Sequence, residues 1–213
     1  MELDLSLYLV TDRRLSRGRC TVDLVREAVV GGATCVQLRE KTGSTRAFIE
    51  EAKALCALLK PLQIPLIVND RVDVALAAGA DGLHLGQADM PLAEARRLVP
   101  PEWIIGISAE SVADAVRAEA LGADYVGISP VFATSTKRDT APALGLEGVR
   151  AIRSAVSLPL VGIGGIQASN VSSVIRAGAD GAAVVSAIVS ADSPADAARI
   201  LRKEIERAKQ ERR

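Results

Sequence analysis

Residues 122–140 read GADYVGISPVFATSTKRDT, which joins a helix terminator, a strand and a polar loop. The run at 125–128 is apolar and stops at Pro130, a pattern typical of a buried strand. The loop that follows this strand in the sequence carries three hydroxyl groups at 134–136 and then two cations at 137–138. Such a loop after a buried strand indicates an anion receptor on a rigid scaffold, although plain strand connections also have this composition.

The triplet Gly-Ala-Asp that opens this stretch recurs along the chain. Equivalent triplets, one of them Gly-Ala-Thr, lie at 32–34, 79–81 and 178–180, so the four are 47, 43 and 56 residues apart. Each lies between a helical pattern and an apolar run, where glycine can take the left-handed conformation that ends a helix. The spacing equals about two strand–helix units, which favours a barrel with a pairwise repeat over an open doubly wound sheet.

The rest of the chain alternates between short apolar runs and helical patterns. The expected strands are 5–10, 35–38, 65–68, 82–85, 103–107, 125–128, 159–163 and 181–185. The expected helices are 21–30 (capped by Thr21), 45–60, 72–78, 92–99, 112–121, 146–156, 169–177 and 194–209. This alternation predicts parallel strands joined by crossovers, in one α/β domain over residues 1–213: a single (β/α)8 TIM barrel.

Composition narrows the possible partners. The 26 basic residues balance 26 acidic ones, so no overall field indicates a nucleic-acid or membrane partner. The three cysteines show neither CxxC pairing nor metal-ligand spacing, which fits free thiols in a reducing compartment. No apolar run reaches 18 residues and no leader is visible, so the expected location is cytoplasmic, with small molecules as partners and a homo-oligomer left open.

Polar residues follow the second predicted strand. Alternation places Gln37 and Arg39 on one side, with Lys41 beyond the strand end, so an amide and two cations would meet at the end of the barrel where barrel active sites lie. The same residues could form an exposed charged loop, but the closeness of Arg39 to a buried strand favours a functional interpretation.

Two aspartates, Asp70 and Asp89, follow the third and fourth strands. Two carboxylates from different loops, with room left for water and phosphate oxygens, suit Mg²⁺. Asp70 could instead cap the next helix. The one histidine, His84, lies inside an apolar run and is expected to be structural, which leaves no Ser-His-Asp or Cys-His arrangement.

Small residues follow the later strands. Ser108 ends the fifth run as a hydroxyl donor, and Ser111 behind it could cap a helix. The sequence GIGGI at 162–166 and the Ser186 region follow strands seven and eight, where barrels often bind phosphate. We therefore expect a cationic, metal-assisted anion site over strands two to six and a backbone anion site over strands seven and eight.

Together these segments resemble the thiamine-phosphate synthase family, whose fold is a (β/α)8 barrel. The matching runs are YLVTD at 8–12, VQLREK at 36–41, LIVNDRVDVALAAGADGLHLGQAD at 66–89, GISA at 106–109, GADYVGISPVFATSTK at 122–137, VGIGGI at 161–166 and GADGAAVVSAI at 178–188. They include nearly every strand end, in the order of the family. Glu110, Ser129 and Ala133 depart from the family pattern, which often has histidine, glycine and proline there.

The resemblance implies a transferase that joins 4-amino-2-methyl-5-(diphosphooxymethyl)pyrimidine to 4-methyl-5-(2-phosphoethyl)thiazole, also in its carboxylated form, giving thiamine phosphate and diphosphate. By resemblance, the pyrimidine diphosphate is held by Gln37, Leu38, Arg39, Glu40, Lys41, Asn69, Ser108 and Lys137. The thiazole phosphate is held by Thr134, Ser135, Thr136, Gly165, Val185 and Ser186. By the same resemblance, Asp70 and Asp89 are expected to bind one Mg²⁺ per active site. The implied catalytic residues are Arg39, Lys41, Ser108 and Lys137, which stabilise the leaving diphosphate in a dissociative substitution.

Two alternatives remain. A related thiazole tautomerase would isomerise the thiazole phosphate without needing the diphosphate and metal set, and a non-catalytic barrel would only bind thiamine precursors. The intact Asp70, Asp89 and TSTK at 134–137 argue against the tautomerase. The charged residues at the strand ends argue against the non-catalytic barrel, since unpaired charges in a cleft are costly to keep without a use. The long polar loop at 133–143 is the segment expected to close over ligands.

Overall fold

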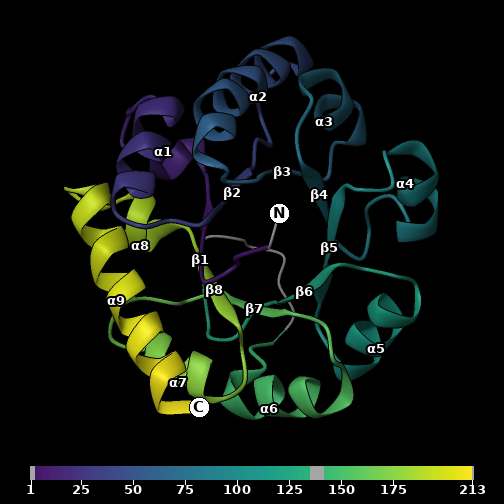
Figure 1. Ribbon diagram of the computed structural model, residues 1–213, viewed down its shortest axis with the longest axis vertical. Helices are drawn as coiled ribbons and strands as arrows, with labels where there is room; N and C mark the ends of the chain where they lie inside the picture. The colour runs from purple at the N-terminus through teal and green to yellow at the C-terminus, as the bar shows by residue number, and fades with distance from the viewer. Residues whose placement is uncertain (1–2, 135–141, 213) are drawn as a thin grey trace.

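Eight parallel strands close into a barrel in the order of the sequence (Figure 1). This computed structural model describes residues 3–134 and 142–212. The strands are β1 (Leu7–Val10), β2 (Cys35–Leu38), β3 (Leu66–Asn69), β4 (Gly82–Leu85), β5 (Ile104–Ala109), β6 (Tyr125–Ile128), β7 (Leu160–Ile163) and β8 (Gly181–Val184). Each strand pairs with the next, and β8 pairs with β1, so the predicted (β/α)8 barrel is confirmed.

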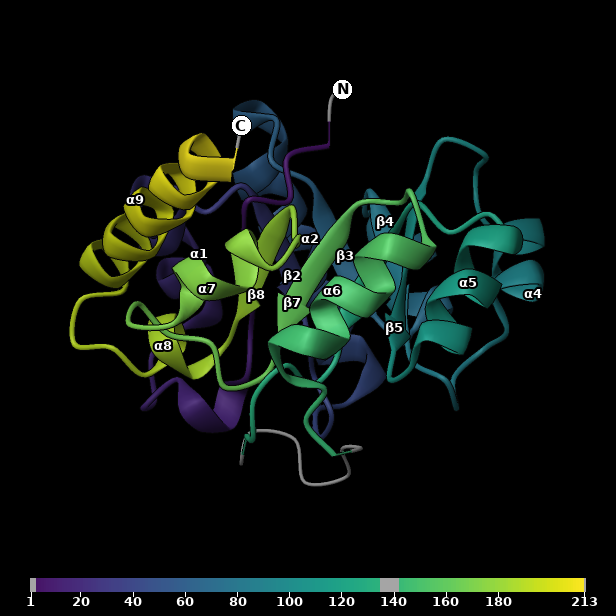
Figure 2. The same ribbon diagram turned by 90° about the horizontal axis from the view of Figure 1, so that it is seen from below.

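Helices surround the barrel as an outer ring (Figure 1). In the described part of the chain they are α1 (Thr21–Val30), α2 (Thr45–Leu59), α3 (Val72–Ala78), α4 (Leu92–Leu98), α5 (Val112–Ala120), α6 (Gly145–Ala155), α7 (Val171–Arg176), α8 (Ser186–Val189) and α9 (Pro194–Arg212), with 3-10 turns η1 (Arg13–Leu15) and η2 (Lys60–Leu62). Figure 2 shows that the described chain begins and ends at the same end of the barrel. No helix in these ranges is long and apolar enough to cross a bilayer.

The recurring triplets lock the strands together in pairs. In all four, the glycine has positive φ, as predicted for helix ends: 105° at Gly32, 69° at Gly79, 83° at Gly122 and 120° at Gly178. The third residue of each triplet then makes two hydrogen bonds with a residue at the start of the preceding strand, which is the first residue of β1, β3 and β7 and the second residue of β5. Its backbone N–H donates to that residue's carbonyl, and its side chain accepts from that residue's N–H.

We call each of these contacts a strand bracket. The four brackets are Thr34 to Leu7, Asp81 to Leu66, Asp124 to Ile105 and Asp180 to Leu160, with side-chain distances of 2.7–3.1 Å. They join β1 to β2, β3 to β4, β5 to β6 and β7 to β8. The pairwise repeat in the sequence is therefore the repeat of this contact, and each added hydrogen bond contributes about 1 kcal/mol.

The element bounds agree with the sequence pattern to within two residues, except that α9 runs three residues beyond its expected end. Thr21 is the first residue of α1 and not its cap; Cys20 occupies the cap position without a side-chain hydrogen bond. Ser111 does cap α5, through a bond from the backbone of Asp114. The single turn α8 and both 3-10 turns were not predicted, because three or four residues show no periodicity.

The core has two parts. Most apolar side chains pack between the strands and the helices. A smaller cluster fills the barrel interior and includes two tyrosines, Tyr8 and Tyr125, which are at most 1% exposed. This inner cluster lies directly beneath the candidate site.

Candidate active site

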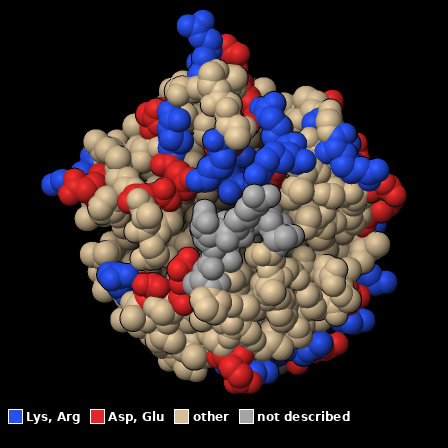
Figure 3. Space-filling model, turned by 180° about the vertical axis from the view of Figure 1, so that it is seen from behind, with Lys and Arg blue, Asp and Glu red and all other residues tan. Residues whose placement is uncertain are grey.

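A cavity of about 480 Å³ opens at the end of the barrel where the strands finish. Every strand contributes to its lining, through Tyr8, Gln37, Asn69, His84, Ser108, Tyr125, Val161 and Ala183. Its volume lies in the range of small-molecule sites. Figure 3 views this face, on which basic side chains gather along one sector with acidic ones beside them.

Most of the residues predicted from the sequence line this cavity. They are Gln37, Arg39, Lys41, Asn69, Asp70, Asp89, Ser108, Thr134, Gly165, Val185 and Ser186. Ser135, Thr136 and Lys137 lie outside the described residues, as does most of the 133–143 loop. Leu38 and Glu40 do not line the cavity: Leu38 is 1% exposed in the outer core, and Glu40 faces Arg13. The substrate contacts of Leu38 and Glu40 therefore stay predictions, and neither side chain faces the cavity.

Arg39 is held in place by a buried acid. Its Nη1 donates to Asp12 Oδ2 at 3.0 Å, and its backbone N–H donates to Thr11 Oγ1 at 3.0 Å. The Asp12 side chain is 3% exposed and the Arg39 side chain 18%. Among residues 3–134 and 142–212 the guanidinium makes this one side-chain contact, so its other N–H groups can face the cavity. Asp12 was not among the predicted site residues, although the matching run YLVTD ends on it.

Asp70 and Asp89 lie together beside Lys41. Lys41 Nζ donates to Asp70 Oδ2, so Asp70 does not cap α3 as it could have done; Arg71 occupies that cap position. Asp89 Oδ2 accepts from the backbone of Gly86 at 2.7 Å. Burial raises the pKa of Asp89, and the adjacent Asp70 raises it further, against the lowering effect of Gly86 and Lys41.

This pair fits a divalent cation. One lysine lies beside two neighbouring carboxylates, and burial together with Asp70 raises the pKa of Asp89. Over residues 3–134 and 142–212, no three His, Cys, Asp or Glu side chains converge on one point. The donor set therefore matches Mg²⁺, which commonly takes one or two carboxylates and completes its shell with water and phosphate oxygens.

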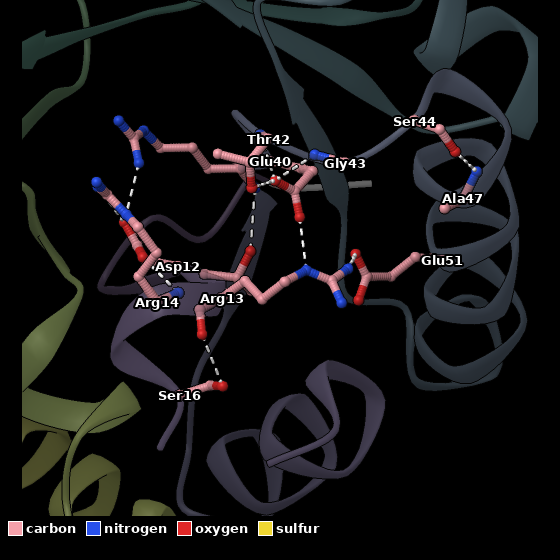
Figure 4. A network of polar contacts seen from close by, with 12 residues as sticks. Asp12, Arg13, Arg14, Ser16, Glu40, Thr42, Gly43, Ser44, Ala47 and Glu51 are labelled. Atoms are coloured by element: carbon pink, nitrogen blue, oxygen red, sulfur yellow. Dashed lines mark hydrogen bonds and ion pairs between the residues drawn. The ribbon is translucent and has the colours of Figure 1, made fainter. Parts of the chain in front are cut away.

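Glu40 stabilises the loop that carries Arg39 and Lys41 through hydrogen bonds and an ion pair (Figure 4). Arg13 lies between two carboxylates, with Nε at 2.7 Å from Glu40 and Nη2 at 3.0 Å from Glu51. Glu40 Oε1 also accepts from the backbone of Thr42 and Gly43, at 2.7 and 3.0 Å. Burial would raise the pKa of Glu40, but these hydrogen bonds outweigh it and lower the pKa to about 2.

Replacing Glu40 with glutamine is expected to lower the free energy of unfolding by about 1–2 kcal/mol at pH 7. Because the folded-state pKa is depressed, the wild-type stabilisation is complete above the usual glutamate value of 4.5 and is lost as the pH falls toward about 2. Urea unfolding of both proteins between pH 7 and 3 measures this. Glu50→Gln, at an exposed position of α2, is the control. A Glu40→Gln deficit that stays constant with pH would contradict the assignment.

The glycines after β7 bring that loop against the loop after β6. Gly164 and Gly165 have φ of 99° and 62°. A Cβ on Gly164 would lie 2.6 Å from Pro130 Cβ, and one on Gly165 would lie 2.7 Å from the Ala133 carbonyl oxygen. Larger residues are therefore excluded by both conformation and space. This contact joins the GIGGI segment to the residues that precede the hydroxyl-rich loop.

His84, expected to be structural, faces the cavity as well as the barrel interior. Its Nε2 lies 2.9 Å from Ser108 Oγ and its Nδ1 lies 2.9 Å from the Tyr125 hydroxyl, and the ring lines the cavity. The sequence pattern hid this, because a histidine in an apolar strand resembles a core residue. Glu110, one of the departures from the family pattern, also lines the cavity.

Comparison with known proteins agrees with this geometry. Residues 7–188 match the family model described as thiamine monophosphate synthase. The thiamine-phosphate synthase of Albidiferax ferrireducens is 56% identical over 95% of this chain and 92% of its own length. That of Methanoculleus marisnigri is 54% identical over 97% and 98%.

Solved structures give the same result. The thiamine phosphate pyrophosphorylase from Pyrococcus furiosus superposes with a TM-score of 0.90 at 43% identity, covering 97% of this chain and 98% of that one. A 3-hexulose-6-phosphate synthase superposes with a TM-score of 0.69 at 20% identity, over 93% of this chain and 99% of that one, and shares the fold. The chain described here belongs to the thiamine monophosphate synthase family.

Proposed function

We propose that this chain is a thiamine-phosphate synthase, a transferase that joins the pyrimidine diphosphate to the thiazole phosphate and releases diphosphate. The observation that carries the proposal is the wall of the cavity on which Arg39 and Lys41 lie beside the carboxylates Asp70 and Asp89. Cations next to a metal-type acid pair suit a diphosphate better than a monophosphate or a neutral ligand.

The reaction that suits this wall is a dissociative substitution. The bond between the pyrimidine methylene and the diphosphate oxygen breaks, and both electrons leave with the diphosphate. Arg39 and Lys41 stabilise the charge that develops on the leaving group, with the Ser108 hydroxyl as a further donor. A Mg²⁺ held by Asp70 and Asp89 would supply additional neutralisation of that charge, one ion per site.

The opposite wall orients the nucleophile. The segment containing Gly165, together with Val185, Ser186 and Thr134, lines the other side of the cavity and suits the thiazole phosphate. Holding that phosphate would direct the thiazole nitrogen at the cationic methylene, and its lone pair forms the new C–N bond. The nitrogen carries no proton in this step, so no general base is required. We expect the carboxylated thiazole phosphate to be accepted as well.

The test is diphosphate release by the purified protein. Release is expected only when the pyrimidine diphosphate, the thiazole phosphate and Mg²⁺ are all present, and chelation by EDTA is expected to stop it. Consumption of thiazole phosphate alone would identify a tautomerase instead. Binding of either substrate without turnover would identify a precursor-binding protein.

A further inference from the structure

A continuous chain of hydrogen bonds crosses the interior of the barrel and ends in the cavity. Gln37 Nε2 donates to the Tyr8 hydroxyl at 3.0 Å, and the hydroxyls of Tyr8 and Tyr125 are 2.8 Å apart. The Tyr125 hydroxyl lies 2.9 Å from His84 Nδ1, and His84 Nε2 lies 2.9 Å from Ser108 Oγ. Five strands supply these five residues, so the chain is formed only when the barrel closes.

Two glycines make room for it. A Cβ on Gly106 would lie 2.0 Å from Cζ of Tyr125, and a Cβ on Gly127 would lie 3.0 Å from Cε1 of His84. The rings also contact one another, with centroid distances of 5.9 Å between the tyrosines and 5.6 Å between Tyr125 and His84. The interior thus reserves space for these rings in these orientations.

The hydrogen bonds of the chain can all point the same way, from Gln37 toward Ser108. The Gln37 amide nitrogen can only donate, so the Tyr8 oxygen accepts, and Tyr8 has its own proton for Tyr125. Tyr125 can then donate to His84 Nδ1. A neutral imidazole that accepts at Nδ1 must donate at Nε2, and its partner there is Ser108. Burial raises the pKa of both tyrosines well above the usual value, so each phenol keeps its single proton.

We propose that Tyr125 and His84 are positioning residues that fix the direction of the Ser108 hydroxyl. With His84 in the Nε2–H tautomer, Ser108 accepts from the ring and presents its own proton to the cavity. With the opposite tautomer, Ser108 would donate to the ring and turn a lone pair toward the anion. The inference rests on the proposed function, because it is the departing diphosphate that the Ser108 proton would meet.

The first test uses the fact that His84 is the only histidine in the chain. Protein labelled with ¹⁵N-histidine gives one pair of ring nitrogen signals, which identifies the tautomer in the ligand-free protein without any turnover. We expect protonated Nε2 and bare Nδ1 at pH 7. Protonated Nδ1, or a ring protonated at both nitrogens, would overturn the proposal.

The second test is kinetic and separates positioning from structure. Tyr125→Phe is expected to lower kcat about tenfold, to change the KM of either substrate less than twofold, and to convert part of His84 to the other tautomer. In a Ser108→Ala background, Tyr125→Phe is expected to have no further effect on kcat. A tenfold loss that persists in that background would make Tyr125 merely structural and overturn the proposal.

Ile67→Val is the matched control. Ile67 is fully buried in the same interior cluster as the tyrosines but makes none of these hydrogen bonds. It is expected to leave both the tautomer and kcat unchanged; a change equal to that of Tyr125→Phe would overturn the proposal. If the wild type releases no diphosphate, the role given to Ser108 is overturned together with the proposed function, while the measured tautomer still reports the direction of the hydrogen bonds.

Discussion

Replacing Asp89 with asparagine is expected to reduce diphosphate release at least 100-fold while making the substrate-free protein slightly more stable. The loss follows from removing one of the two carboxylates that fit Mg²⁺, since metal-assisted charge neutralisation contributes several kcal/mol. The gain follows from the raised pKa of Asp89, which means that its charged form is disfavoured in the fold. Asparagine can still accept the hydrogen bond from Gly86, so the local turn is kept.

The sign of the stability change depends on pH. A carboxyl whose folded-state pKa is raised destabilises the fold while it is ionised, and this cost disappears as the pH falls and the group takes up a proton. We therefore expect the midpoint of thermal unfolding to rise by on the order of 2 °C at pH 7, and the difference from wild type to vanish in acid. Calorimetry at several pH values, beside the diphosphate assay with varied Mg²⁺, measures both effects.

Asp73→Asn is the control for this variant. Asp73 lies in the first turn of α3, three residues after Asp70, and pairs with Arg71 outside the carboxylate pair. Its replacement is expected to preserve the Mg²⁺ dependence of diphosphate release. Equal activity losses in the two variants would remove the special role of Asp89.

Replacing Arg39 with lysine is expected to lower kcat/KM for the pyrimidine diphosphate about 100-fold, equivalent to about 2.8 kcal/mol. Lysine keeps the charge but not the planar fork, which lets Arg39 bind Asp12 on one edge and face the cavity with the other. Asp12, nearly buried, would also lose a well-placed partner, so the thermal midpoint is expected to fall.

Arg14→Lys is the matched control, because Arg14 contacts the same carboxylate from the solvent side. Its Nη2 lies 3.5 Å from Asp12 Oδ2, and its side chain is 62% exposed. Steady-state kinetics of both variants distinguish orientation of Arg39 from general charge near Asp12. If Arg39→Lys retains wild-type kcat/KM, the assignment of one guanidinium edge to Asp12 and the other to the cavity is wrong.

The fold and most of the cavity could be predicted from the sequence because both depend on local patterns. Apolar runs, glycine triplets and polar residues at strand ends are short-range signals, and parallel strands bring their ends together in any barrel. The partners of these residues were not predictable in the same way. That Asp12 holds Arg39, or that Tyr8 reaches Tyr125, depends on contacts between strands far apart in the sequence, with no local pattern to mark them.

The orientation of the His84 ring was also not predictable from the sequence. An apolar neighbourhood correctly indicated that its backbone lies in a buried strand. Strand alternation then decides whether the ring points outward to the helices or inward to the cavity, and a four-residue strand is too short to fix that choice from its residues alone.

The strand brackets also bear on where the chain can be cut and rejoined. Each bracket lies within one β–α–β pair, so a circular permutant opened in the loop before β3, β5 or β7 keeps all four contacts between residues near in sequence. A permutant opened between β1 and β2 must close the Thr34–Leu7 contact across nearly the whole polypeptide, which costs loop entropy and slows folding. The barrel thus consists of four two-stranded units, and the connections between these units are the places where the chain is best opened.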